Sequence, residues 1–165
     1  MRRRRTNASL VLVLAGAVLL AAGCSSGGSG SGSDPAHANG PKVTVQTRSI
    51  AGVGAVLVTA RGYPLYMFQP DNQRSVTCTG ACAGTWPPLK VPDGGSFAAG
   101  PGVKSALLGT DPDPEGGDVV TYDGWPLYTY TGDVQPGQAT GQAIDLNGGE
   151  WYVLRPDGKP LIPAP

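Results

Sequence analysis

The chain has 165 residues and balances 12 lysines and arginines against 12 aspartates and glutamates. Four of the cations, Arg2 to Arg5, stand before an apolar run, and the 142 residues that follow residue 23 carry a net charge of about −4. This balance provides no basic patch for nucleic acid or for anionic lipid headgroups. The single histidine, His37, lies in a low-complexity stretch, which excludes a histidine-based triad or metal site in a folded domain.

The N-terminus predicts export. The charged segment 1–5 precedes an apolar run over residues 10–20, which is too short to span a hydrocarbon core of about 30 Å and is typical of a signal peptide. Small residues then lead to Cys24, in a pattern that resembles the bacterial lipobox. We therefore predict a lipoprotein signal peptide over 1–23 and lipidation of Cys24, with diacyl and palmitate-type chains anchoring the protein outside the cytoplasm, on the bacterial cell membrane.

A Gly/Ser-rich segment follows the lipidated cysteine. Residues 25–40 (SSGGSGSGSDPAHANG) offer almost no apolar side chain to bury. We expect residues 24–41 to form a flexible tether with a root-mean-square reach of roughly 20–24 Å. An ordinary secretory signal with an unmodified cysteine is the alternative to the lipid anchor.

The composition changes at Lys42, and residues 42–165 are predicted to form one folded domain. The 26 glycines and 16 prolines of the chain disfavour long helices. An internal duplication is visible, because residues 62–71 align with residues 124–133 at an offset of 62, both with the pattern G-aromatic-P-L-Y-x-aromatic-x-x-D. Further matches follow in the same order, so we predict repeat one at about 53–94 and repeat two at about 117–158.

Each repeat is expected to begin with a hairpin. A β-branched run (55–59 or 119–122) leads to a turn at Arg61-Gly62 or Asp123-Gly124, and then to a return strand. Val58-Thr59 aligns with Val120-Thr121 at the same offset of 62. The strand period of two places Tyr66 and Phe68 on one face, likewise Tyr128 and Tyr130, with Leu65 and Met67 opposite. The prediction is a mainly β fold, a small antiparallel domain of two related hairpin-containing repeats, with a short helical turn within 77–84.

The return strands carry a resemblance. Six residues fit the Y-x-[FWY]-x-x-D motif of a family of predicted bacterial lipoproteins, also described as a secreted repeat of unknown function: Tyr66, Phe68, Asp71, Tyr128, Tyr130 and Asp133. The resemblance covers roughly residues 53–158. It implies a cell-envelope lipoprotein of unassigned molecular function, and it supplies no substrate.

Two cysteines remain after the anchor. In an exported domain Cys78 and Cys82 are expected to form a disulfide, worth about 2 kcal/mol for so short a loop. The alternatives are a redox-active dithiol or a Cu(I) thiolate site with Met67 as third ligand.

Two carboxylates recur in the duplication, and three tryptophans lie within it. Asp71 and Asp133 could serve acid/base chemistry or bind a cation, but each follows a turn signal, where an aspartate caps the local backbone. With the aromatic pairs Tyr66/Phe68 and Tyr128/Tyr130, the indoles could form a surface on which a carbohydrate or quinone stacks, or they could pack in the core, which is poor in other large apolar side chains: Trp86, Trp125 and Trp151.

These observations favour a non-enzymatic, membrane-anchored binding or interaction module for an unknown envelope ligand or protein. We expect a monomer, and we assign no catalytic residue, cofactor or metal. The alternative is an extracytoplasmic redox or electron-transfer accessory that acts through Cys78 and Cys82 or through the aromatic array.

Overall fold

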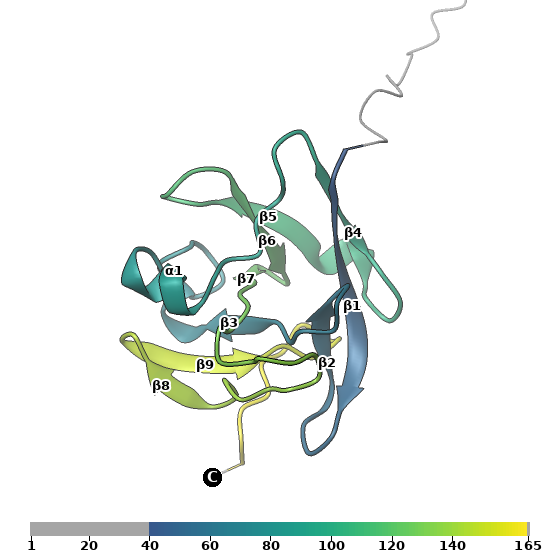
Figure 1. Cartoon of the computed structure of the whole chain (residues 1–165), viewed down its shortest axis with the longest axis vertical. Helices are drawn as coiled ribbons and strands as arrows, with labels where there is room; N and C mark the ends of the chain where they lie inside the picture. The colour runs from purple at the N-terminus through teal and green to yellow at the C-terminus, as the bar shows by residue number, and fades with distance from the viewer. Residues whose placement is uncertain (1–39, 165) are drawn as a thin grey trace, which may run out of the picture. The chain divides into compact units, whose positions relative to one another are not determined.

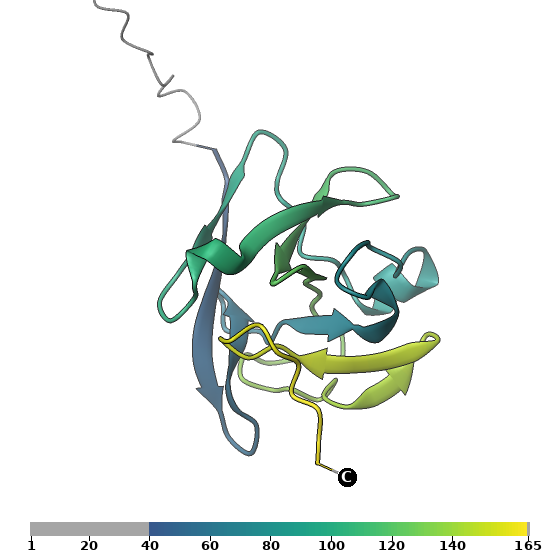
Figure 2. The ribbon, with the colours of Figure 1, turned by 180° about the vertical axis from the view of Figure 1, so that it is seen from behind.

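A computed structural model describes residues 40–164 (Figures 1 and 2). The predicted signal peptide, the predicted lipidation site Cys24 and nearly all of the expected tether lie outside these residues. Within residues 40–164, no helix has the length and apolar character needed to cross a membrane.

The domain is mostly β, as predicted, and consists of three small sheets. The first has the order β2 (Gly54–Thr59), β1 (Lys42–Ile50), β4 (Ser96–Ala99), with β1 antiparallel to β2 and parallel to β4. The second has the order β3 (Tyr66–Phe68), β9 (Gly149–Val153), β8 (Ile144–Leu146). The third has the order β5 (Leu108–Pro112), β6 (Asp118–Tyr122), β7 (Trp125–Pro126).

Within the part of the chain that the structure describes, helical structure is confined to single turns. These are α1 (Ala81–Thr85) and two 3-10 turns, η2 (Gln69–Asp71) and η3 (Ser105–Leu107). The helical turn predicted within 77–84 is therefore present, shifted by one residue at its end.

The two predicted hairpins are present but differ in their turns. In repeat one the backbone N–H of Thr59 donates to the carbonyl of Tyr63, so three residues form the turn. In repeat two Tyr122 pairs directly with Trp125, because Asp123 (φ 51°) and Gly124 (φ 79°) both adopt the left-handed conformation of a two-residue turn. The turn of repeat one is thus one residue longer.

This difference corrects the alignment of the first strands. Leu65 N–H donates to Leu57 O, whereas its counterpart Leu127 N–H donates to Val120 O. Leu57 therefore corresponds to Val120 at an offset of 63, and the offset of 62 predicted for Val58-Thr59 is wrong. Alignment of the two repeats by sequence alone does not reveal that the extra residue lies inside the turn.

Each hairpin is completed by a segment of the other repeat. Leu154, from repeat two, accepts from Leu57 N–H and donates to Leu65 O. Leu89, from repeat one, accepts from Val120 N–H and donates to Leu127 O in the same way. The repeats are therefore interlocked, because the backbone groups that close each hairpin at Leu65 and Leu127 pair with a residue of the other repeat.

A pseudo-twofold axis passes between the two return strands. Tyr66 and Tyr128 exchange both backbone hydrogen bonds, at 2.9 and 3.0 Å between nitrogen and oxygen. Equivalent residues meet each other in this way only at a twofold-related contact.

The core has two layers that follow the predicted strand alternation. One cluster contains Tyr66, Phe68 and Tyr128, with Tyr130 packed against it. The other contains Leu65, Met67 and Leu127. The predicted faces of the return strands are confirmed.

The centre of the first cluster is a stack of aromatic rings. Trp86 and Trp151 lie parallel with ring centroids 4.0 Å apart, and each also stacks on a ring from the other repeat's return strand. Phe68 stacks on Trp151 at 4.2 Å and Tyr130 stacks on Trp86 at 4.1 Å. Trp86 and Trp151 are fully buried, so the hypothesis of an aromatic surface is wrong for them: a core short of other large apolar side chains needs their area. Trp125 is half-buried.

Candidate functional site

The family motif forms a buried polar centre that links the repeats. The Tyr66 hydroxyl donates to Asp133 Oδ2, and the Tyr128 hydroxyl donates to Asp71 Oδ2, each at 2.7 Å. Each of these two tyrosines therefore bonds to the aspartate of the other repeat. The sequence showed that the two residue types recur, but not that they pair crosswise.

The second oxygen of each aspartate closes its own turn. Asp71 Oδ1 accepts from the backbone N–H and the hydroxyl of Thr77, at 2.8 and 2.6 Å. Asp133 Oδ1 accepts the same two bonds from Thr140, both at 2.7 Å. Because both aspartates are almost completely buried and both oxygens of each accept hydrogen bonds, the geometry fits a structural role in turns.

Burial dominates the ionisation of this centre. Desolvation raises the pKa of the Asp71 carboxyl, although the hydrogen bonds from Thr77 and Tyr128 act in the opposite direction. Desolvation, together with the neighbouring aspartates, raises the pKa of Tyr66 and of Tyr128 far above the ordinary value of 10.0. Both phenols are therefore donors over the whole physiological pH range.

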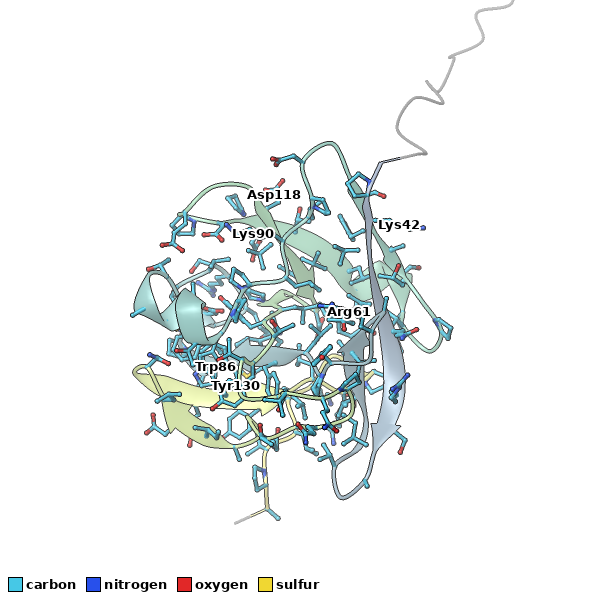
Figure 3. All side chains as sticks on the ribbon, in the orientation of Figure 1. Lys42, Arg61, Trp86, Lys90, Asp118 and Tyr130 are labelled. Carbon is cyan, nitrogen blue, oxygen red and sulfur yellow. A yellow bond between two sulfur atoms is a disulfide. The ribbon has the colours of Figure 1, made fainter. Side chains whose placement is uncertain are left out.

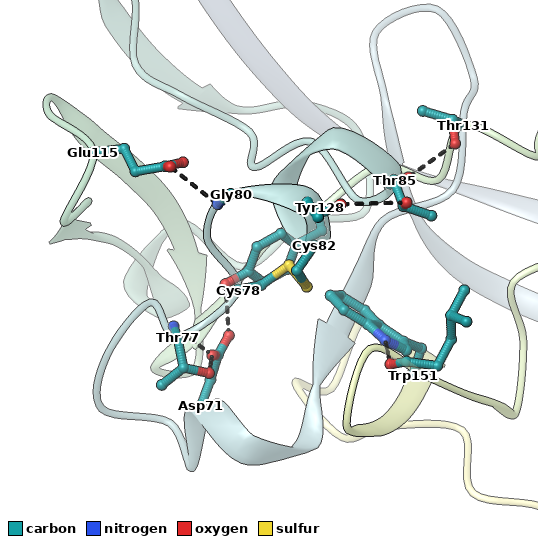
Figure 4. The surroundings of a disulfide bond; sticks show 12 residues. Asp71, Thr77, Cys78, Gly80, Cys82, Thr85, Glu115, Tyr128, Thr131 and Trp151 are labelled. Carbon is teal, nitrogen blue, oxygen red and sulfur yellow. Dashed lines mark hydrogen bonds between the residues drawn. A yellow bond between two sulfur atoms is a disulfide. The ribbon is translucent and has the colours of Figure 1, made fainter.

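The cysteines form a disulfide, Cys78–Cys82, around the start of α1 (Figure 4). Cys78 is buried and Cys82 half-buried. Gly80 between them adopts a positive φ of 58° and donates its N–H to Glu115 Oε1 at 3.0 Å. Met67 belongs to the other core cluster, so the structure does not bring it to the sulfurs as a third metal ligand.

A cavity opens beside the hairpin turn of repeat one. Its volume is about 470 Å³, within the range of small-molecule sites. We call it cavity one, and it is lined by residues from β1, from the turn between β2 and β3, from Leu89, and from the strand-turn segment of repeat two: Lys42, Val43, Thr44, Thr59, Ala60, Arg61, Tyr63, Leu89, Thr129, Tyr130, Thr131 and Asp133.

A second cavity, cavity two, has a volume of about 400 Å³. Three of its lining residues are the repeat counterparts of residues in cavity one: Met67 corresponds to Thr129, Gln69 to Thr131 and Trp125 to Tyr63. The pseudo-twofold axis therefore relates the two cavities, and Trp125 lies in a cavity wall and not on an aromatic surface with the other tryptophans.

Sequence reasoning did not identify the cavities. It considered Asp133 as a motif residue and as a possible acid/base or cation-binding group, and Tyr130 as a motif residue and as part of a possible aromatic platform, and it treated Arg61 only as part of a turn. The usable signal was the position of Arg61, two residues before Tyr63 in a hairpin turn, where side chains of loop residues gather around binding sites.

The fold and the polar centre define a class of internally duplicated β domain in which two interlocked repeats share one core. The family model described as a secreted repeat of unknown function matches this chain twice, over residues 48–90 and 109–155. The two matches cover more than half of the chain, and the protein belongs to this family. Neither a curated protein nor a solved structure gives a significant match.

Proposed function

We propose that the protein is a membrane-anchored lipoprotein of the bacterial cell envelope, and that its duplicated domain binds an envelope ligand in cavity one without changing it chemically. The observation that carries the proposal is the contrast between cavity one and the motif residues. Cavity one is open and lined by several side-chain types, whereas Asp133, the motif carboxylate that lines it, is buried with both oxygens engaged. This arrangement supports recognition in preference to acid/base catalysis.

The anchor is tested with the full-length chain in cells. Cys24→Ala removes the proposed lipid attachment site, and the protein is expected to move from the membrane pellet to the soluble envelope fraction. A serine substitution in the tether, such as Gly30→Ser, is the matched control and is expected to leave the protein in the pellet. Retention of the alanine variant after signal-peptide cleavage would contradict the anchor.

Binding is tested by titrating the full-length chain, in detergent micelles, with building blocks of envelope polymers: neutral and acidic sugars, amino acids and short peptides. Thr129→Trp is designed to fill cavity one, and the counterpart Met67 shows that the repeat accommodates a larger side chain at this position. Thr110→Trp, on exposed β5, is the matched control. Binding that Thr129→Trp abolishes and Thr110→Trp preserves supports the proposal. Binding unaffected by Thr129→Trp, or none across the panel, contradicts it.

A redox accessory function is the second candidate, and one observation favours it. Cys78 packs in the same buried cluster as Trp151, which Figure 4 shows among the neighbours of the disulfide, and the ring stack continues from Trp151 through Trp86 to Tyr130 in cavity one. Half-buried Cys82 gives a thiol reductant access to one sulfur.

The two functions predict different reduction potentials. A disulfide that only supports the fold is expected to stay oxidised in glutathione buffers, since structural disulfides lie below roughly −300 mV. A redox couple is expected to accept two electrons and two protons from glutathione and to yield two thiols, with a change in tryptophan fluorescence because Trp151 is nearby. Titration of the full-length chain in glutathione and then dithiothreitol buffers separates the two.

A further inference from the structure

Cavity one and cavity two have diverged in charge although the pseudo-twofold axis relates them. Cavity one is lined by Lys42, from the start of β1, and by Arg61, from the turn between β2 and β3 (Figure 3). Among the described residues that line cavity two, the charged side chain is Glu150. Both repeats therefore contribute to an equivalent cavity, but over the described part of the chain only cavity one is lined by cationic side chains.

The two cations of cavity one are available to a ligand. Within residues 40–164 neither Lys42 nor Arg61 takes part in a salt bridge, in contrast to Lys90 and Arg155. The carboxylate that lines the cavity, Asp133, is only 4% exposed and accepts bonds from Tyr66 and Thr140 with its two oxygens. Its charge therefore faces the protein's own donors.

A third cation strengthens the positive potential at this turn. A Cβ atom placed on Gly62 would lie 2.6 Å from Arg48 Nη1, so the Arg48 guanidinium rests against the turn that carries Arg61. The exported part of the chain is net acidic, and this concentration of cations is therefore a local feature. Such a cluster attracts anions and raises their local concentration.

The Arg61 side chain is oriented for recognition. Its guanidinium carbon lies 5.5 Å from the centroid of the Tyr63 ring, in cation–π contact, and Tyr63 itself lines cavity one. A guanidinium presents a planar fork of donors that matches the two oxygens of a carboxylate or phosphate. The anion-binding group is thus positioned at the wall of the cavity.

The part of cavity one that repeat two contributes suits a ligand that carries hydroxyl groups. Thr129 and Thr131 donate their hydroxyl protons to the carbonyls of Pro87 and Thr85, so the threonine oxygens keep lone pairs that can accept from a ligand. Tyr130 lies between them in sequence, and its ring is fixed by stacking on Trp86. Threonine acceptors in a cavity that is also lined by the aromatic side chains of Tyr63 and Tyr130 complement a sugar, which has many O–H donors and apolar C–H groups.

We propose that cavity one binds an anionic saccharide, with its carboxylate or phosphate at Arg61 and its sugar ring along Thr129, Tyr130 and Thr131. This inference rests on the proposed function, in which cavity one is the binding site, and adds the class of ligand. Lys42 contributes to the positive potential at the rim.

The test compares four probes on the full-length chain in detergent micelles: glucuronate, glucose 6-phosphate, glucose and inorganic phosphate. Glucuronate or glucose 6-phosphate is expected to bind about tenfold or more tightly than glucose, because a hydrogen bond to a charged group adds more than a neutral one. The stronger of the two identifies the anion as carboxylate or phosphate. The preference is expected to weaken at high salt.

Variants locate the anion. Arg61→Gln is expected to bring the affinity for the acidic sugar down to that for glucose, and Lys42→Gln to lower it by less. Lys104→Gln, an exposed lysine outside the cavity, is the matched control and is expected to leave the affinity unchanged. Circular dichroism of Arg61→Gln checks that the hairpin is intact.

Three outcomes would overturn the inference. Glucose that binds as tightly as glucuronate, with binding still sensitive to Thr129→Trp, would refute the anionic ligand but leave cavity one as a binding site. Inorganic phosphate that binds as tightly as glucose 6-phosphate would refute the saccharide. Failure of all four probes, while a peptide of the wider panel binds in cavity one, would refute the ligand class and support the general function.

Discussion

The two repeats keep the same core contacts but connect them with different structures. Between the turn threonine and the stacked tryptophan, repeat one has residues 78–85, with the disulfide and α1. Repeat two has residues 141–150, with β8 and a two-residue turn at Asn147-Gly148. Each connection delivers a threonine to an aspartate at one end and an indole to the stack at the other. The polar centre and the stack are therefore the shared requirement, and the path between them is free to vary.

The difference has a steric cause at the first residue of each connection. Cys78 in repeat one is replaced in repeat two by Gly141, where a Cβ atom would lie 2.6 Å from Cη2 of Trp86. A cysteine at this position would clash with the stacked indole. Repeat two therefore cannot use the disulfide of repeat one, and a hairpin holds its connection in place.

The largest effect is expected from the polar centre, and it should be equal in the two repeats. Asp71→Ala and Asp133→Ala each remove an acceptor of three hydrogen bonds, which leaves a buried tyrosine hydroxyl without its acceptor and a threonine N–H without a partner. We expect each to lower the free energy of unfolding by about 3–5 kcal/mol. Urea unfolding measures both variants. A loss below about 1 kcal/mol in one of them would show that the two centres are not equivalent.

Alkaline pH is expected to lower the stability of the fold through both tyrosine–aspartate pairs. The folded protein keeps the Tyr66 and Tyr128 protons above pH 10.0, where the unfolded chain releases them, because burial raises both pKa values. The folded state then binds more protons, so stability falls as pH rises, by about 1.4 kcal/mol per pH unit for each tyrosine.

Urea unfolding between about pH 9 and pH 11 measures this slope. Tyr66→Phe and Tyr128→Phe are each expected to remove half of the tyrosine contribution, and the double variant all of it. An unchanged slope in the double variant would assign the alkaline loss to other groups.

The sequence predicted the parts of the fold that depend on local patterns. Strand alternation placed Tyr66 and Leu65 on opposite faces, and Asp123-Gly124 predicted a tight hairpin, because side-chain period and positive φ are local properties. The pairing of Leu89 and Leu154 with the hairpin of the other repeat depends on contacts between residues far apart in the sequence. A repeat has the same residues whether it pairs with itself or with its copy, so pattern alone could not predict the interlocking.

The candidate site was harder to predict for the same reason. Cavity one combines side chains from the start of β1, from a turn of repeat one and from a segment of repeat two, and it exists only because the repeats exchange segments. Lys42 and Arg61 carry no motif of their own. The motif residues did attract attention, but burial and mutual hydrogen bonds give them a structural role.

The disulfide is expected to contribute less than the polar centre. Replacing both Cys78 and Cys82 with alanine removes a constraint on the unfolded chain. We expect this to lower the free energy of unfolding by about 2 kcal/mol. The matched change in repeat two is Gly148→Ala, which strains a turn residue with a φ of 92° and is expected to cost about 1 kcal/mol. A larger loss from Gly148→Ala would mean that the hairpin is the stronger of the two devices.

The smallest expected effect is the difference in stability between substitutions of Trp86 and Trp151, whose indole N–H groups have different surroundings. Trp151 Nε1 donates to Leu146 O at 2.9 Å, in the hairpin of repeat two, whereas buried Trp86 Nε1 has no protein partner among the described residues. Both indoles lose similar stacking area on substitution by phenylalanine, because each lies between its twin and one further ring. Trp151→Phe also leaves the Leu146 carbonyl unpaired, so it should destabilise the fold by about 1 kcal/mol more than Trp86→Phe. The stacked rings are coupled, which makes the two single variants, unfolded in urea, the valid comparison. An equal loss would show that the bond to Leu146 contributes nothing, and a larger loss for Trp86→Phe would mean that stacking on Tyr130 outweighs it.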